Sequence, residues 1–506
     1  MAAVVEPRLP VTPWAGRQLW STLALIGIPV SVVFAFSLTG DGAPAAVLYG
    51  VSGILGAILA IGAVYRSEWL IATAVLYMPL SKQIPANIGP GINGPNVLLL
   101  LLLLAWIVNS IRNRRGLIEG VRYGKLMTVY AFLSLISVWV LLQNPVGRDY
   151  FWADGITELK GWLDQFVLFL ALGSLISNGA IARRVVVYCV LGTLVAQAYG
   201  FLEYLDVGEA SSIDDARLLG PAGQPNDFGA FIVYNISPII AYAVLNVWKI
   251  RTWLLIPYFL LTLRLLLATF SRGAYIGLMM ASGAATYFRG KLFFAAVLVA
   301  SGILLWNYPQ LVPDSVRDRF GATTTGYNSP DLDKSSNSRL ILWEAAIEMT
   351  AERPLSGHGF VSFRLLKSQY TDVPVEESDP HNQYLYVASQ LGLPALLVFL
   401  ALLYGFYRSS LLVYRFGPDM SSRVIGLGGL TMLAGVVTIN MFGSRMVNSE
   451  VSGYFWVYFA VLISLLREWE TAIREKAEGS DDDDSSVKQR KHRPTATKRG
   501  HERARR

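Results

Sequence analysis

One histidine and two arginines stand where polar sequence meets apolar sequence, and their side chains suit acid–base and phosphate chemistry. His381 lies in "SDPHNQYLY", and the whole chain holds only four histidines. Its imidazole titrates near neutral pH and can accept a proton from a hydroxyl nucleophile. Arg217 and Arg272 lie in "DDARLLGP" and "ATFSRGAY", and a guanidinium donates two parallel hydrogen bonds to phosphate oxygens. These residues indicate a base near a site for a phosphate-bearing group.

The segments that carry these residues are apolar and long enough to cross a membrane. The chain has 506 residues, of which 53% are hydrophobic and 16% charged. Apolar runs of about 17–25 residues recur along most of its length. They lack the alternation that a transmembrane barrel requires. We therefore predict an all-α polytopic membrane protein with about 12–14 transmembrane helices. The single Cys189 allows no disulfide within the chain.

The alternation of basic and acidic connections predicts an orientation. The expected spans are residues 19–38, 44–64, 68–81, 96–111, 124–142, 162–178, 182–203, 227–247, 252–269, 273–288, 291–307, 382–407, 423–443 and 451–467. Basic connections such as "RNRRGLIEGVRYGK" and "YRSSLLVYRFGPDMSSR" alternate with cation-poor ones. The positive-inside rule then puts both termini in the cytoplasm. No cleavable signal is evident, so we expect the first span to stay.

One expected outer connection, residues 308–381, is too long to be an unstructured loop. We predict a helix over about 338–352, capped by Asn337 or Ser338 and ended by Pro354. Gly357 and Gly359 then allow a tight turn. The predicted apolar stripe, which would let this helix lie on the outer membrane face, is Leu340, Trp343 and Ile347.

Arginines gather on the expected outer side. Charged groups beside membrane spans are costly and therefore indicate a functional site. Besides Arg217 and Arg272, the outer arginines are Arg264, Arg339, Arg353 and Arg445. Such a layer at the lipid–water boundary suits a lipid pyrophosphate. Structural alternatives stay open: Arg264 paired with Asp164 or Glu203, Arg217 with Asp214 or Asp215, Arg339 with Glu344 or Asp333, and His381 or Asn226 as a helix cap. No HExxH motif or cysteine pair is present, so we expect no metal or other cofactor.

Four stretches, taken in order, resemble the O-antigen ligase and polymerase superfamily. They are "RLLGPAGQPNDFGAFI", "LLLATFSRGAYIGLM", "SRLILWEAAIEMTAERPLSGHGF" and "DPHNQYLYVASQLGLPALLVF". The resemblance covers roughly residues 190–410, which we take as the core and which includes the loop 308–381. Residues 1–189 and 411–467 would be further transmembrane helices, and 468–506 a disordered, basic cytoplasmic tail.

The resemblance implies glycan transfer at the periplasmic face of a bacterial cytoplasmic membrane. The implied donor is a glycan on undecaprenyl pyrophosphate, and the implied acceptor is a hydroxyl of lipid A-core or of a growing glycan. His381 would activate the acceptor, while Arg272 and Arg217 would neutralise the leaving pyrophosphate. Further substrate contacts would come from Arg339, Asn382, Asn226, Arg353 and Tyr384. The chemistry would be metal-independent and would invert the anomeric centre.

Other functions fit parts of this pattern. A protein O-oligosaccharyltransferase shares the same core, and a flippase of lipid-linked sugars also has many spans and basic residues. A transporter usually places its coupling residues near the bilayer midplane, whereas the cations here are expected at the outer edge. A purely structural membrane scaffold would give no reason for that layer. Membrane lipids are expected partners, and no nucleic acid is expected. The basic tail suits anionic lipid, but we expect it to act rather as a solvated anchor that fixes the orientation by its positive charge.

Overall fold

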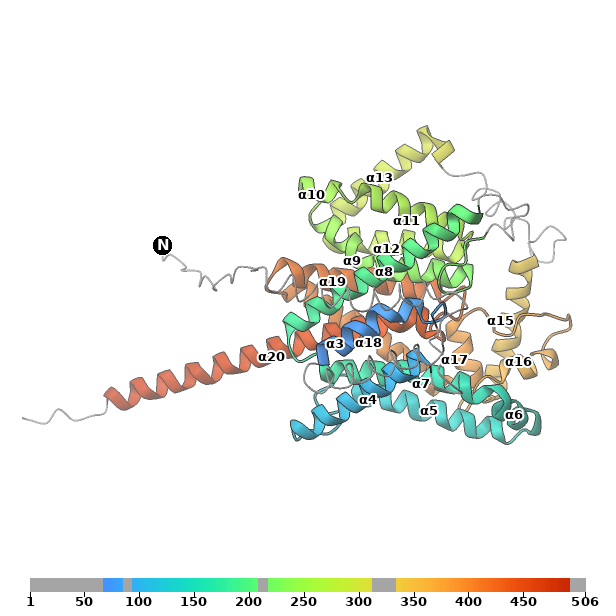
Figure 1. Cartoon of the computed structure of the whole chain (residues 1–506), viewed down its shortest axis with the longest axis horizontal. Helices are drawn as coiled ribbons and strands as arrows, with labels where there is room; N and C mark the ends of the chain where they lie inside the picture. The colour runs from blue at the N-terminus through green and yellow to red at the C-terminus, as the bar shows by residue number, and fades with distance from the viewer. Residues whose placement is uncertain (1–66, 85–92, 208–216, 312–333, 492–506) are drawn as a thin grey trace, which may run out of the picture.

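The computed structural model describes residues 67–84, 93–207, 217–311 and 334–491, and this part of the chain is a bundle of helices without a strand (Figure 1). Eight of its helical stretches are long and apolar enough to cross a membrane. The prediction of an all-α polytopic membrane protein is therefore confirmed. The predicted spans at 19–38 and 44–64 lie outside the described residues.

The other predicted spans each coincide with a helix or a pair of helices. The elements are α3 Ser67–Tyr77, η1 Met78–Leu80, α4 Gly94–Arg112, α5 Gly124–Leu142, α6 Pro145–Tyr150, η2 Phe151–Gly155, α7 Ile156–Leu175, α8 Gly179–Val207, α9 Pro225–Leu245, α10 Ile250–Trp253, α11 Ile256–Ala268, α12 Arg272–Arg289, α13 Lys291–Asn307, η3 Pro309–Leu311, α15 Lys334–Glu352, α16 Phe363–Leu366, η4 Lys367–Gln369, α17 Gln383–Leu391, α18 Leu393–Phe416, α19 Met420–Ile439 and α20 Ser449–Lys491.

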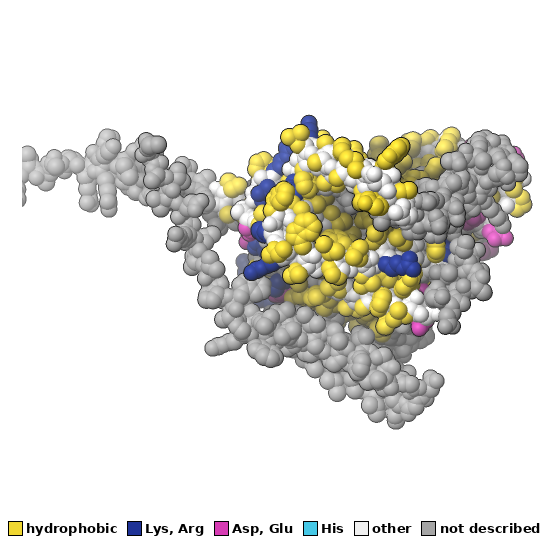
Figure 2. All heavy atoms as spheres, turned by 90° about the horizontal axis from the view of Figure 1, so that it is seen from above, with side chains coloured by type: hydrophobic (Ala, Val, Ile, Leu, Met, Phe, Trp, Pro, Cys, Tyr) yellow, Lys and Arg dark blue, Asp and Glu magenta, His cyan; other side chains and the backbone are white. Residues whose placement is uncertain are grey.

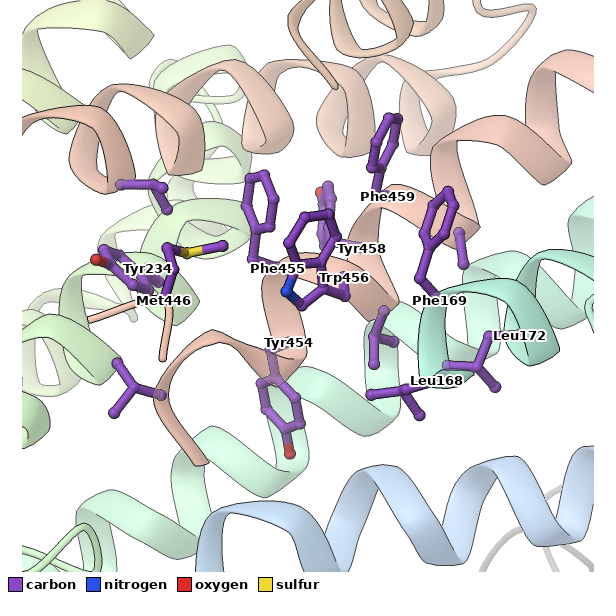
Figure 3. Packing of buried hydrophobic residues seen from close by; sticks show 14 of the residues in the cluster. Leu168, Phe169, Leu172, Tyr234, Met446, Tyr454, Phe455, Trp456, Tyr458 and Phe459 are labelled. Atoms are coloured by element: carbon purple, nitrogen blue, oxygen red, sulfur yellow. The ribbon is translucent and has the colours of Figure 1, made fainter. Parts of the chain in front are cut away.

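The interior of the bundle is built around α20, α9 and α19. In its apolar stretch α20 is 89% buried, and α9 and α19 are each 72% buried, against 17% for α4. Aromatic side chains fill the space between α20 and α7, where Phe169 contacts the rings of Trp456 and Phe459 (Figure 3). Lipid is as apolar as these side chains, so close packing is what holds such helices together.

Small residues bring α9, α12 and α19 close together. A Cβ atom on Gly277 of α12 would lie 2.4 Å from a side-chain carbon of Ile439 on α19. On Gly435 of α19 it would lie 2.9 Å from Val233 of α9. This close packing agrees with the Gly/Ala-rich sequence of α12. It fixes the three helices relative to one another, and one end of each borders the candidate site described below.

The loop helix is present, but it buries a different face from the predicted one. It is α15, which begins at Lys334 instead of Ser338 and ends, as predicted, at Glu352. Its packing contacts are Leu342, Ala345, Ala346 and Met349, all fully buried together with Phe363. Ile347 of the predicted stripe is 56% exposed. The buried face is decided by tertiary packing, because Phe363 of α16 and Leu385 of α17 pack against the side of α15 that carries these four residues.

The predicted span 382–407 is broken at Gly392, so His381 does not head a spanning helix. The chain forms α17, turns at Gly392 with φ 89°, and starts again as α18. The segment after α15 crosses this break, where the N–H groups of His358 and Gly359 donate to Ser389 and Gln390. His381 therefore precedes a separate short helix that packs against α15.

Gly392→Ala should destabilise this crossing. Its Cβ would lie 2.4 Å from the carbonyl oxygen of Leu355, and a positive φ is strained for alanine. We expect a loss of about 1–3 kcal/mol in stability, seen as a lower thermal midpoint of the purified protein in detergent. Gly290→Ala is the matched control, because a Cβ there meets no atom within 4 Å and the backbone is extended. Equal midpoints for the two variants would contradict the expectation.

Two further features bear on orientation and on the tail. In Figure 2, Lys and Arg gather on the visible face at the end of the bundle from which α20 extends. Helix α20 continues to Lys491, which differs from the disordered tail expected from residue 468. Residues 492–506 lie outside the described part.

Candidate active site

Four arginines line one polar cleft between α9, α12, α15 and the α19–α20 turn. They are Arg217, Arg272, Arg339 and Arg445. The cleft has an empty volume of about 480 Å³, which includes the open solvent at its mouth. Its other lining residues are Asn226, Phe270, Ser271, Gly273, Ile439 and Phe442. So many cations around one space, with no carboxylate among the described residues that line it, make an anion-binding site the natural interpretation.

Helix starts add to the positive potential of this cleft. Arg272 is the first residue of α12, and Asn226 lies in the first turn of α9. Exposed N–H groups and the helix dipole make a helix N-terminus favourable for anions. A cation at that position opposes the dipole, so the charge of Arg272 does not stabilise α12 through the helix dipole. The tight turn before it includes Phe270 with φ 51°.

Arg217 is held by neutral groups among the described residues. Its Nε donates to the carbonyl oxygen of Thr269 at 3.2 Å, and its Nη2 to Oδ1 of Asn226 at 3.3 Å. The carboxylates proposed as alternative partners, Asp214 and Asp215, lie outside the described residues. Asn226 does not cap α9, because the side chain of Gln224 accepts the capping hydrogen bond.

Arg264 has a structural partner, but it is neither of the two carboxylates considered for an ion pair. Arg264 donates to the hydroxyl of Tyr204 at 2.8 Å and does not line the cleft. Asp164 pairs with Lys160 instead. Glu203 accepts hydrogen bonds from two backbone N–H groups, those of residues 219 and 220, at 2.8 Å each.

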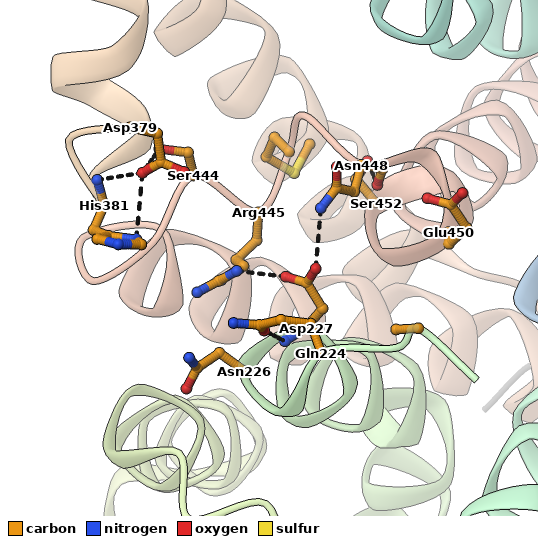
Figure 4. Close-up of polar contacts among 12 residues, drawn as sticks. Gln224, Asn226, Asp227, Asp379, His381, Ser444, Arg445, Asn448, Glu450 and Ser452 are labelled. Carbon is orange, nitrogen blue, oxygen red and sulfur yellow. Dashed lines mark hydrogen bonds and ion pairs between the residues drawn. The ribbon is translucent and has the colours of Figure 1, made fainter. Parts of the chain in front are cut away.

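Arg445 is the cleft residue whose importance the sequence did not reveal. It was expected only as part of the outer layer, but it is 7% exposed and lines the cleft. Its Nη1 lies 2.5 Å from Oδ1 of Asp227, and Asn448 donates to the other carboxylate oxygen at 3.0 Å (Figure 4). The signal in the sequence was an arginine in the short turn "GSRMVNSE" between two apolar spans.

His381 lies beside the arginine cleft but is not one of its lining residues. Its Nδ1 is 3.3 Å from Oδ1 of Asp379, which also accepts from the backbone N–H of His381 (Figure 4). Ser444, next to Arg445, donates to the same carboxylate at 3.4 Å. His381 has φ 49°, a strained conformation of the kind that clusters at functional sites.

The surroundings keep the imidazole of His381 neutral. Burial lowers its pKa below the usual value of 6.5, and the positive charges of Arg445 and Arg339 lower it further. Asp379 and Glu377 act in the opposite direction, yet the net shift of the pKa is downward. A neutral imidazole with one carboxylate at Nδ1 leaves Nε2 free to accept a proton.

The pH dependence of any reaction that uses His381 as a base follows from these signs. Activity should rise with pH through the lowered pKa of His381, so the acid limb should lie below about 6.5. Asp379→Asn removes a negative neighbour and should shift that limb to lower pH. Arg339→Gln removes a positive neighbour and should shift it to higher pH. Rate–pH profiles of the three proteins would show this order, and profiles that coincide would contradict it.

The remaining predicted substrate residues lie in different places. Asn382 caps α17 by accepting from the N–H groups of Tyr384 and Leu385, at 3.0 and 3.2 Å. The hydroxyl of Tyr384 donates to the carbonyl oxygen of Val437 at 3.0 Å. Both residues line an apolar groove between α17, α18 and α19, which is separate from the arginine cleft and has an empty volume of about 770 Å³, open solvent again included. Arg353 is exposed, 4.0 Å from Glu352, and does not line the cleft.

Metal ligands do not gather in the described part of the chain: no three His, Cys, Asp or Glu side chains there come together. The His358 imidazole is packed instead as a structural group, with Nε2 3.0 Å from the carbonyl oxygen of Met349.

Comparison with known proteins gives two matches. Residues 257–400 match the family described as O-antigen ligase, and this segment holds Arg272, Arg339 and His381 but not Arg217 or Arg445. A protein of Rickettsia conorii that is provisionally named a polysaccharide ligase is 24% identical over 270 residues. That alignment covers 50% of this chain and 62% of the relative, so the chain spans less than two thirds of the relative's length.

Proposed function

Because this chain belongs to the O-antigen ligase family, we propose that it transfers a glycan from a polyprenyl pyrophosphate lipid to a hydroxyl acceptor. Glycan ligation is the activity that the family name carries in general. The observation that supports the finer proposal is the cleft lined by Arg217, Arg272 and Arg339, with His381 beside it.

In the proposed reaction the arginines bind the pyrophosphate of the donor. The anomeric C–O bond to this group breaks, and its electron pair leaves on the pyrophosphate oxygen. Fixed guanidiniums and the start of α12 stabilise that developing charge without reorganising during the reaction. The partial enclosure of the cleft strengthens the interaction relative to bulk water.

His381 is the proposed general base. It accepts the proton of the acceptor hydroxyl as the oxygen forms its bond to the anomeric carbon, while Asp379 orients the ring from the Nδ1 side. Attack from the face opposite the pyrophosphate would invert the anomeric centre. Asn382 and Tyr384 would shape the surroundings of the base from the adjoining groove.

The proposed location is the periplasmic side of a bacterial cytoplasmic membrane, with both termini in the cytoplasm. The gathering of Lys and Arg at the end of the bundle from which α20 extends supports this orientation (Figure 2). The candidate site is at the other end, beside α15 and α17 (Figure 1). The proposed donor carrier is undecaprenyl pyrophosphate, and the proposed acceptor is lipid A-core or a growing glycan.

A reconstituted transfer assay tests this proposal. The full chain in proteoliposomes would receive a lipid-linked oligosaccharide and candidate acceptors: lipid A-core, a second lipid-linked glycan, or a protein. Release of polyprenyl pyrophosphate together with an elongated acceptor supports the proposal and identifies the acceptor class. Movement of intact donor across the bilayer, without cleavage, would overturn it in favour of a transporter.

A further inference from the structure

Arg445 lines the cleft and forms a buried pair with Asp227 behind it, and the proposed reaction, argued from Arg217, Arg272 and Arg339, does not use this pair. We propose that Asp227 is a positioning residue that holds Arg445 as a fourth binding cation for the pyrophosphate. This inference rests on the proposed function, since it concerns the same anion.

The geometry shows why Asp227 acts through Arg445. Both of its carboxylate oxygens are occupied, one by Arg445 at 2.5 Å and the other by Asn448 at 3.0 Å. Its backbone N–H donates to the side chain of Gln224 at 2.8 Å. Asp227 is 4% exposed and is not one of the cleft-lining residues. It is therefore rigid, shielded and unable to contact a substrate in the cleft.

Arg445, in contrast, has one side toward Asp227 and another toward the cleft. Its guanidinium donates to Asp227 through Nη1 alone, which leaves the other N–H groups for a second partner. A Cβ on Gly443 would lie 2.5 Å from Nε and 2.9 Å from Nη2 of Arg445. The absence of a side chain at Gly443 therefore leaves room for the guanidinium in this position.

Two consecutive residues in the first turn of α9 thus hold two arginines of the cleft. Asn226 accepts a hydrogen bond from Arg217, and Asp227 from Arg445. The start of α9 therefore holds two cations that come from separate parts of the sequence, the segment before α9 and the α19–α20 turn. Figure 4 shows Asn226, Asp227 and Arg445 at this helix start. Asn226, expected as a substrate contact, takes a positioning role in this arrangement.

The charges explain why the pair is useful. A guanidinium that is 7% exposed needs a counter-charge to stay in the protein interior. Asp227 supplies it without being one of the lining residues, and the described lining of the cleft contains no carboxylate. An anion that enters then meets a cation that is already oriented and desolvated, so that little further ordering is needed on binding.

Binding of farnesyl pyrophosphate to the purified full chain in nanodiscs tests the proposal. Arg445→Lys keeps a buried charge for Asp227, but one ammonium group cannot also reach the anion. We expect about tenfold weaker binding for Arg445→Lys and for Asp227→Asn. The double variant should be no weaker than Arg445→Lys alone, because Asp227 acts only through Arg445. Arg353→Gln, which changes an exposed arginine outside the cleft, should bind as wild type does.

Three results separate the ways in which this inference can fail. Unchanged affinity in Arg445→Lys, while Arg272→Gln weakens binding, would overturn the role of Arg445 and leave the proposed function standing. Additive losses in the double variant would show that Asp227 does not act through Arg445. Unchanged affinity in Arg272→Gln and Arg217→Gln as well would overturn the pyrophosphate site itself. Thermal midpoints of each variant would show whether a loss of binding reflects unfolding.

Discussion

Replacement of His381 by alanine is expected to lower the rate of glycan transfer by about 10²- to 10⁴-fold, the range of a lost general base. The Nδ1 atom of this imidazole lies 3.3 Å from Asp379, and burial together with the positive charges of Arg445 and Arg339 lowers its pKa, so it is neutral at pH 7. Alanine removes the proton acceptor and leaves the four cleft arginines in place. Donor binding should therefore change much less than the rate of transfer.

The measurement combines cells and purified protein. In cells, the variant should accumulate lipid-linked donor and lose the finished glycan product at equal protein level in the membrane. In nanodiscs, it should bind farnesyl pyrophosphate about as wild type does.

His358→Ala is the matched histidine control: this imidazole is 6% exposed and contacts the carbonyl oxygen of Met349. It should lower the amount of folded protein and leave the rate per folded molecule nearly unchanged. Near wild-type transfer by His381→Ala would rule out the base.

The sequence predicts the helices of this protein better than their contacts. Apolar length and the absence of alternation are properties of one segment, so the described spans were found at nearly their observed positions. The break at Gly392 was missed because the run of apolar residues continues through it. Only the crossing segment near Gly357, which comes from a distant part of the chain, requires the turn.

The candidate site shows the same limit. Arg217, Arg272 and Arg339 were predicted from residue type and side of the membrane, and the structure gathers them in one cleft. Arg353 met the same criteria and lies elsewhere, because it follows the C-terminal end of α15, whereas Arg339 lies near the start of that helix, about 20 Å away along its axis. The orientation of Arg445 depends on its contact with Asp227, which lies more than two hundred residues earlier in the chain. No sequence pattern relates two residues so far apart.

Replacement of Arg272 by glutamine should lower the rate of transfer by about 10²- to 10³-fold, the effect of removing one preorganised group from a developing charge. Arg272 lies at the start of α12, where its charge and the helix dipole act on the same anion. Lysine at this position keeps the charge but loses the two-pronged donor, so Arg272→Lys should recover only part of the rate.

The thermal midpoint distinguishes a catalytic role of Arg272 from a purely structural one. Because its positive charge opposes the α12 dipole, glutamine should leave the thermal midpoint nearly unchanged while activity falls. Arg264→Gln is the matched control, since Arg264 precedes the same turn, donates to Tyr204 and does not line the cleft. It should retain near wild-type transfer.

Inhibition by inorganic pyrophosphate should weaken in Arg272→Gln and not in Arg264→Gln. A parallel fall of activity and midpoint in Arg272→Gln, with unchanged pyrophosphate inhibition, would make Arg272 a folding residue and require another cation to carry the leaving group.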